Sequence, residues 1–118
     1  MLLCDDAPGF RALLRYTLDE DPEVRVVGEA GDGEACLAAI PEVCPDVVLL
    51  DISMPGLQGL DAIGALRECA PECRIVALSG FTADEMAGPA LARGAHAYVE
   101  KGTGATAIRD AIRSSLRA

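Results

Sequence analysis

The stretch VVLLDISMPG, residues 47–56, decides the fold and also points to the site. Its first four residues are apolar without alternation, a pattern typical of a strand that is buried on both faces of a parallel sheet. The strand ends in a carboxylate, Asp51, and Pro55 and Gly56 mark the following segment as a loop. Because open α/β sheets bind ligands at the carboxyl ends of their strands, Asp51 is either a functional group or merely a cap for that loop.

Outward from this stretch, strand-like and helix-like segments alternate along the whole chain. Strands are predicted at residues 2–4, 24–30, 47–51, 74–79 and 96–100, each followed by a helix. Five such units with short connections predict a flavodoxin-like (βα)5 fold, which is a doubly wound parallel sheet with strand order 2-1-3-4-5 and helices on both faces. The chain has 118 residues, so we expect one domain covering residues 1–118.

Local signals set the expected ends of the helices. Asp6 is predicted to cap the first helix, whose apolar face would include Leu13, and the second helix should run to about Val43. A Gly-Pro pair at residues 88–89 falls inside the fourth helix, which we therefore expect to be short, kinked or late-starting. Thr103 or a neighbouring residue is expected to cap the last helix.

The charge balance argues against several classes of partner. The 10 Lys and Arg against 19 Asp and Glu give a net charge of −9. Without a cluster of cationic side chains, direct binding to nucleic acid or to an anionic membrane surface is not expected. No apolar segment reaches the length of a membrane span, and the N-terminus lacks a signal-peptide pattern.

The cysteines do not form a metal or disulfide pattern. There are five, at positions 4, 36, 44, 69 and 73, with no CxxC pair and a single histidine, His96. Neither a disulfide framework nor a zinc site is expected from these spacings. We therefore expect reduced thiols and a cytoplasmic protein, with His96 a surface or half-buried residue that has no role.

Polar side chains stand at the ends of four predicted strands: Asp5 and Asp6, Asp51, Ser79, and Lys101. The expected strand order makes strands one and three neighbours, so the three aspartates would converge, with the serine and the lysine on their flank. Three close carboxylates repel one another, and one lysine does not balance them, whereas a divalent cation would. An all-oxygen set favours Mg²⁺, and the whole arrangement predicts phosphoryl transfer onto the carboxylate of Asp51.

The same residues resemble those of a known family, the receiver domain of bacterial two-component response regulators. The resemblance covers the whole chain and rests on Asp5-Asp6, Asp51 followed by Met54-Pro55-Gly56, Ser79-Gly80, Tyr98 and Lys101. Residues 45–59 and 26–33 are most similar to receivers that precede LuxR-type helix-turn-helix output domains. The resemblance implies a signalling domain that catalyses only its own phosphorylation and dephosphorylation, and not an enzyme with a separate substrate.

The resemblance also implies roles for the residues that carry the chemistry. Asp51 resembles the phospho-accepting aspartate, and Lys101 is similar to the lysine that pairs with the phosphoryl group. The implied metal ion is Mg²⁺, and its implied ligands are Asp6, Asp51 and the backbone carbonyl of Ser53, with Asp5 acting nearby or through water.

A sensor histidine kinase is the phosphoryl donor that the resemblance implies, with small acyl phosphates as substitutes. Ser79 resembles the switch hydroxyl, and Tyr98 the aromatic residue whose rotamer reports phosphorylation. The switch would alter the face formed by helix four, strand five and helix five. The expected readout, in transcription regulation, is self-dimerisation through this face or release of an output domain that is absent from this chain.

Three other functions stay open. A pseudo-receiver would keep the fold without being phosphorylated, and Gly102 leaves room for it because many receivers have proline after the lysine. A haloacid-dehalogenase-like phosphatase needs its nucleophile on the first strand and a second carboxylate two residues on, where this chain has Ser53. A flavodoxin-like flavin binder needs a phosphate loop after strand one and aromatic rings, but only 3% of the residues are aromatic.

Three arginines form a row at helical spacing on the last predicted helix: Arg109, Arg113 and Arg117. A solvated face is the ordinary explanation for such a row. The alternative is a basic stripe that docks an acidic partner, or that docks the fourth helix of a second copy through Asp84 and Glu85.

Overall fold

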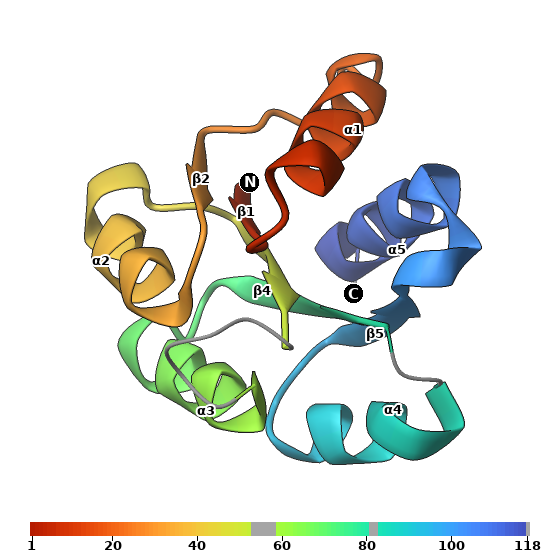
Figure 1. Cartoon of the computed structure of the whole chain (residues 1–118). Helices are drawn as coiled ribbons and strands as arrows, with labels where there is room; N and C mark the ends of the chain where they lie inside the picture. The colour runs from red at the N-terminus through yellow and green to blue at the C-terminus, as the bar shows by residue number, and fades with distance from the viewer. Residues whose placement is uncertain (53–58, 81–82, 118) are drawn as a thin grey trace.

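The computed structural model describes residues 1–52, 59–80 and 83–117, and in this part of the chain five strands alternate with five helices (Figure 1). The strands are β1 (Leu2–Cys4), β2 (Gly28–Ala30), β3 (Val47–Asp51), β4 (Arg74–Ser79) and β5 (Ala97–Glu100). The helices are α1 (Pro8–Asp19), α2 (Gly33–Val43), α3 (Gly59–Cys69), α4 (Ala83–Ala92) and α5 (Ala105–Arg117). A 3₁₀ turn, η1 (Lys101–Thr103), links β5 to α5.

The strands form one parallel sheet in the order β2-β1-β3-β4-β5, which confirms the predicted topology. Its register brings the predicted site residues to one edge. Cys4 pairs with Leu50, so Asp5 and Asp51 occupy the next positions on neighbouring strands. Asp51 in turn pairs with Leu78, the residue before Ser79.

Each face of the sheet carries its own hydrophobic core. Helices α2, α3 and α4 cover one face, and α1 and α5 cover the other (Figure 1). The residues of β3 and β4 alternate between the two cores, and this explains why the run Val47 to Leu50 shows no polar alternation. The apolar rows expected on the helices are buried as well, for example Ile63 and Leu66 of α3 and Ile108 and Ile112 of α5.

Three predictions near the N-terminus are wrong. The second strand was expected to begin at Val24 but spans only Gly28–Ala30; the residues before it turn through a hydrogen bond from Val24 N–H to the Asp21 carbonyl. Asp6 does not cap α1: the residue at the N-cap is Ala7, whose N–H donates to Asp5 Oδ1. On the same helix, Leu13 was expected on the buried face and is 53% exposed.

The fourth helix is the shortest of the five described helices, as expected, although it contains Pro89 and begins at Ala83 without delay. The last helix is capped not by Thr103 itself but by its neighbour Gly104, whose carbonyl accepts a hydrogen bond from the Ile108 N–H. Thr103 lies in η1 and its hydroxyl donates to the Glu100 carbonyl. Gly104, with φ of +92°, then turns the chain into α5. Within the described residues, no helix has the length and apolarity needed to cross a membrane.

Candidate functional site

Three polar side chains are buried at the carboxyl edge of the sheet. Asp5 follows β1 and is 2% exposed, Asp51 ends β3 and is 2% exposed, and Ser79 ends β4 and is fully buried. They are held there because the apolar residues before them are fixed in both cores. The predicted convergence of these strand ends is therefore confirmed.

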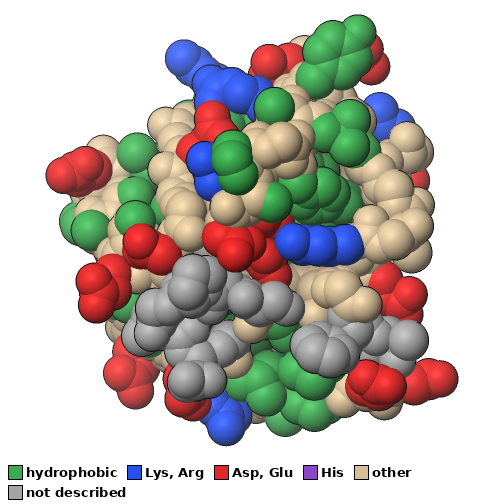
Figure 2. Space-filling model, viewed as in Figure 1, with side chains coloured by type: hydrophobic (Ala, Val, Ile, Leu, Met, Phe, Trp, Pro, Cys, Tyr) green, Lys and Arg blue, Asp and Glu red, His purple; other side chains and the backbone are tan. Residues whose placement is uncertain are grey.

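Asp6 adds a third carboxylate, which is exposed at the rim of the same site. One carboxylate oxygen from each of Asp5, Asp6 and Asp51 lies within 4.8 Å of the others. On the surface, acidic side chains gather at the centre of this face, next to a basic one (Figure 2). The site is thus open to solvent through Asp6 while its two other carboxylates are inside.

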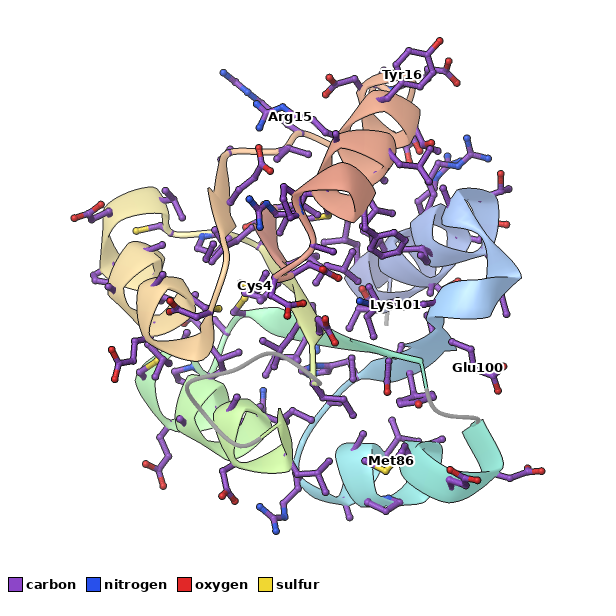
Figure 3. All side chains as sticks on the ribbon, in the orientation of Figure 1. Cys4, Arg15, Tyr16, Met86, Glu100 and Lys101 are labelled. Carbon is purple, nitrogen blue, oxygen red and sulfur yellow. The ribbon has the colours of Figure 1, made fainter. Side chains whose placement is uncertain are left out.

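Lys101 bridges the two buried carboxylates. Its Nζ lies 2.9 Å from Asp5 Oδ2 and 2.9 Å from Asp51 Oδ2, and it donates a hydrogen bond to the latter. The lysine belongs to η1, just beyond β5, and lies near the ends of the central strands (Figure 3). Burial lowers the pKa of the Lys101 ammonium, but the contacts with Asp5 and Asp51 outweigh burial and hold this pKa above its ordinary value.

The site carries more negative than positive charge. Three carboxylates and one ammonium leave two uncompensated negative charges, which a single divalent cation would balance. Asp5 Oδ2 is buried and, among the described residues, receives no hydrogen bond, although Lys101 lies at ion-pair distance. A buried carboxylate oxygen of this kind fits the role of a metal ligand, and hard oxygen donors suit Mg²⁺.

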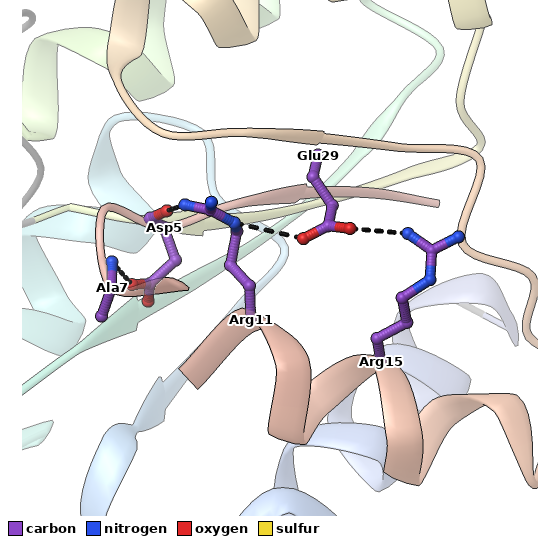
Figure 4. A network of polar contacts seen from close by, with 5 residues as sticks. All are labelled: Asp5, Ala7, Arg11, Arg15 and Glu29. Carbon is purple, nitrogen blue, oxygen red and sulfur yellow. Dashed lines mark hydrogen bonds and ion pairs between the residues drawn. The ribbon is translucent and has the colours of Figure 1, made fainter. Parts of the chain in front are cut away.

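An arginine network that the sequence did not reveal supports the first aspartate. Arg11 Nη1 donates to the backbone carbonyl of Asp5, and Arg11 Nε donates to Glu29 Oε1 at 3.1 Å (Figure 4). Arg15 holds the other oxygen of Glu29 at 2.6 Å. The network joins α1 to β2 around the loop that carries the acidic pair. No sequence pattern marks it, because the pairing depends on how α1 lies across β2.

A second neighbour that the sequence did not reveal is Phe10 of α1. The Lys101 ammonium lies 4.9 Å from the centre of its ring, within the range of a cation–π contact. The ring also packs against the core beneath α1 and α5. Phe10 is therefore a further neighbour of the Lys101 ammonium besides Asp5 and Asp51.

Three further residues were considered in the sequence: Tyr98, Ser53 and His96. Tyr98 is half-buried on β5 and packs against the core beneath α2, α3 and α4. Ser53, the predicted carbonyl ligand, lies outside the described residues. His96 is half-buried, as expected, but it has a structural role that the sequence did not indicate, because its Nδ1 accepts a hydrogen bond of 3.0 Å from the Ile75 N–H.

The arginine row on α5 makes contacts within the chain. Arg113 Nη2 pairs with Glu23 at 3.0 Å, and Arg113 Nε lies 3.5 Å from Asp21. Arg109 lies 3.9 Å from its neighbour Asp110. At least the central arginine of this row thus serves the packing of α5 against the segment between α1 and β2.

The profile of the response regulator receiver domain matches residues 1–113. The chain therefore belongs to the response regulator receiver family, whose members are signalling domains of two-component systems. Its relatives include transcriptional regulators of the LuxR and NarL type.

Two relatives and one solved structure illustrate the similarity. The chain is 39% identical over 101 residues to the nitrate/nitrite response regulator NarL of Escherichia coli, covering 86% of this chain and 47% of NarL. It is 35% identical over 115 residues to the transcriptional regulatory protein YxjL of Bacillus subtilis, covering 98% and 53%. The receiver domain of the putative response regulator NarL from Mycobacterium tuberculosis superposes with a TM-score of 0.91 at 33% identity, covering 99% and 94%. The chain spans about half the length of these two relatives.

Proposed function

We propose that this chain is a phosphorylation-dependent switch in which Asp51 accepts a phosphoryl group from a histidine of a sensor kinase. The proposal is carried by one observation, the convergence of Asp5, Asp6 and Asp51 beside the Lys101 ammonium. Burying carboxylates costs free energy even when they are paired, so stability alone does not account for this arrangement. Membership of the receiver family supports the same function.

In the proposed reaction, Lys101 holds one oxygen of Asp51 and so orients the nucleophile. The Asp51 carboxylate attacks the phosphorus atom of the donor. A new O–P bond forms, and the bond from phosphorus to the histidine nitrogen, or to the oxygen of an acyl phosphate, breaks. Lys101 then follows the negative charge onto the phosphoryl oxygens, and its raised pKa keeps it protonated throughout.

Asp5, Asp6 and Asp51 would together hold Mg²⁺, with the backbone carbonyl of Ser53 as a further proposed ligand. When bound, the ion would shield the negative charge of the incoming phosphoryl group. The buried Oδ2 of Asp5, which lacks a hydrogen bond among the described residues, supports this ligand set. Arg11, which donates to the Asp5 carbonyl, would hold the Asp5 backbone in place while the side chain serves as a ligand.

The proposed switch runs from the strand ends to the far side of β5. Ser79 would donate its hydroxyl to the phosphoryl group, and Tyr98 would turn inward behind it. The face formed by α4, β5 and α5 would then change between two arrangements and control either self-association or an output domain. We propose a cytoplasmic setting in transcription regulation for this switch, in keeping with the relatives.

Intact mass after incubation with Mg²⁺ and an acyl phosphate tests the chemistry. We expect one phosphoryl group on the wild-type chain and none on Asp51→Asn. Asp61→Asn is the matched control, because Asp61 is exposed on α3 and pairs only with Arg93 among the described residues. A chain that stays unmodified under all conditions would favour the pseudo-receiver, and modification of Asp51→Asn would place the acceptor elsewhere.

Light scattering of the phosphorylated and unphosphorylated chain tests the readout. Self-association that appears only on phosphorylation, and is reduced by Glu85→Lys on α4, would support dimerisation through the α4–β5–α5 face. Asp19→Lys on α1 is the charge-matched control outside that face. An unchanged monomer in both states would leave only the output domain as the target of the switch.

A further inference from the structure

Two cysteines face each other in the core beneath α2. The sulfur atoms of Cys4 and Cys36 are 2.6 Å apart, and each residue is 1% exposed. Cys4 is the last residue of β1, and Cys36 lies on α2, which packs on this strand. Cys4 lies beside the first turns of α2 in Figure 3. The proposed phosphorylation chemistry uses neither thiol.

The other three cysteines have different surroundings. Each of their sulfur atoms contacts a backbone carbonyl: Cys44 contacts Pro41, Cys69 contacts Leu66, and Cys73 contacts Arg74. Among the described contacts, a sulfur–sulfur contact therefore occurs only between Cys4 and Cys36. These two residues are far apart in the sequence and lie on different elements. No sequence motif therefore predicts the pair.

The distance between the two sulfur atoms favours a disulfide over two separate thiols. Non-bonded heavy atoms rest about 3.5–4.0 Å apart, so two relaxed thiols would have to separate by about 1 Å. A disulfide has an S–S distance of about 2.05 Å, so bonding requires an approach of only about 0.5 Å. A close-packed interior resists the larger displacement more than the smaller one.

We propose that Cys4 and Cys36 form a modification site, in which a small hydroperoxide converts the two thiols into an intramolecular disulfide. The crosslink would tie α2 to β1, one residue before Asp5. It would close the segment from residue 4 to residue 36, which contains α1 and β2. A crosslink over a segment of this length restricts the unfolded chain and stabilises the folded one.

The reaction balances as two consecutive displacements. The Cys36 sulfur, as thiolate, attacks the outer oxygen of the hydroperoxide; an S–O bond forms, the O–O bond breaks, and the alkoxide or hydroxide leaves and takes up a proton. The Cys4 sulfur then attacks the sulfenic sulfur of Cys36, the S–O bond breaks, and water leaves. Two thiols are oxidised and one hydroperoxide is reduced to an alcohol and water.

The fold decides which sulfur reacts first. β1 lies between β2 and β3, so exposing Cys4 would require opening the sheet. Cys36 lies on an outer helix whose first turn is held by the Asp32 cap on the Ala35 N–H, and opening this turn would expose Cys36 alone. The hydrogen bond with Cys36, together with burial, raises the pKa of the Cys4 thiol, and in the second displacement the Cys4 proton passes to the leaving hydroxyl.

The test uses the full chain, reduced and then treated with hydrogen peroxide while folded. Alkylation in denaturant should then label three of the five cysteines rather than all five. Digestion with trypsin and a Glu-specific protease separates Cys36 from Cys44, because Glu42 lies between them, and separates Cys69 from Cys73 at Glu72. We expect the linked peptides to be those with Cys4 and Cys36.

A thermal unfolding curve gives an independent readout. The oxidised chain should melt several degrees higher than the reduced one. Cys36→Ala should lose both the crosslink and the thermal shift, whereas Cys44→Ser, at an exposed position, should keep both. Five free thiols after treatment, added oxygen in place of the crosslink, or a crosslink between other cysteines would each overturn the proposal.

Discussion

At the carboxyl edge of the sheet, the Lys101 ammonium lies between Asp5 and Asp51, whereas at the amino edge the charged and titratable groups meet mainly backbone. There the Met1 ammonium donates to the Arg25 carbonyl, and His96 Nδ1 accepts from a backbone N–H. The pKa of Lys101 is raised, while burial lowers the pKa of both the Met1 amino group and the His96 imidazole.

One hydrophobic sheet thus favours charge at one edge and disfavours it at the other. Burial opposes the charge of Lys101, Met1 and His96 alike, so the difference comes from what the nearby residues supply. At the carboxyl edge they supply opposite charges at 2.9 Å, and ionised groups are stabilised by one another. At the amino edge, Arg67 of α3 and Arg74 of β4 add to the penalty of burial at His96, and Asp46 only partly offsets burial of the Met1 ammonium.

The largest effect should come from removing the cation at the carboxyl edge. Lys101→Met should lower the rate of phosphorylation of Asp51 by about 10- to 100-fold, because a charged hydrogen bond is worth about 1.5–3 kcal/mol. The measurement is the time course of phosphoryl mass with an acyl phosphate. Lys101→Arg keeps the charge with a different geometry, so its phosphorylation rate should lie between those of the wild-type chain and Lys101→Met. A rate within twofold of wild type would show that the lysine has no part in the chemistry.

Removing one carboxylate from the same edge should weaken Mg²⁺ binding by about tenfold or more, because Mg²⁺ is held through only a few carboxylates. We expect Asp5→Asn to need correspondingly more Mg²⁺ for the same rise in melting temperature. Asp61→Asn again serves as the control at an exposed position. An unchanged Mg²⁺ midpoint in Asp5→Asn would remove Asp5 from the ligand set.

A smaller effect should follow from changing the ring beside the lysine. Phe10→Leu keeps an apolar side chain but removes the cation–π contact, worth about 0.5–1 kcal/mol, so phosphorylation should slow by about two- to fivefold. Phe10→Tyr keeps the ring and should restore the wild-type rate. Equal rates in all three chains would mean that the ring only fills space.

The smallest effect belongs to the amino edge. The pKa of His96 in the folded chain lies below its ordinary value of 6.5, because burial and the nearby Arg67 and Arg74 oppose its charge. The unfolded chain therefore binds the proton first as the pH falls. The contribution of His96 to stability is present above pH 6.5 and is lost as the pH falls through the folded pKa.

His96 is the only histidine in the chain, so its titration can be followed by NMR from a single imidazole resonance. The titration should have its midpoint below that of a histidine in a short peptide. His96→Asn keeps an acceptor for the Ile75 N–H and removes the titration, so its stability should vary less between pH 7 and pH 5. A midpoint above the peptide value would reverse the contrast between the two edges.

The site residues that lie at strand ends could be predicted from the sequence. Asp51 and Ser79 follow runs of apolar residues, and such runs end at the same edge of any parallel sheet. The position of Lys101 just after the last strand followed from the same reasoning. These predictions needed only local patterns and the strand order.

The contacts that escaped prediction depend on how the layers dock. Arg11 of α1 pairs with Glu29 of β2, and Phe10 of α1 meets Lys101 of η1, so both contacts join separate elements. The second strand was overestimated for a related reason. Val24 and Val26 are buried, as in a strand, and the Val27 N–H donates to the Met1 carbonyl, but regular pairing with β1 begins only at Gly28. Burial patterns report side chains and not ladder hydrogen bonds.

The position of the bridging lysine also sets an order of events during protein synthesis. Lys101 comes 50 residues after its partner Asp51, so the ribosome makes both buried aspartates well before it makes their counter-ion. A nascent chain that ends at β3 lacks this counter-ion, and burying the two aspartates without it would cost free energy, so they favour solvent until β5 joins the sheet. Under the proposed function, a chain that ends before residue 101 would lack the lysine of the site and should not accept a phosphoryl group.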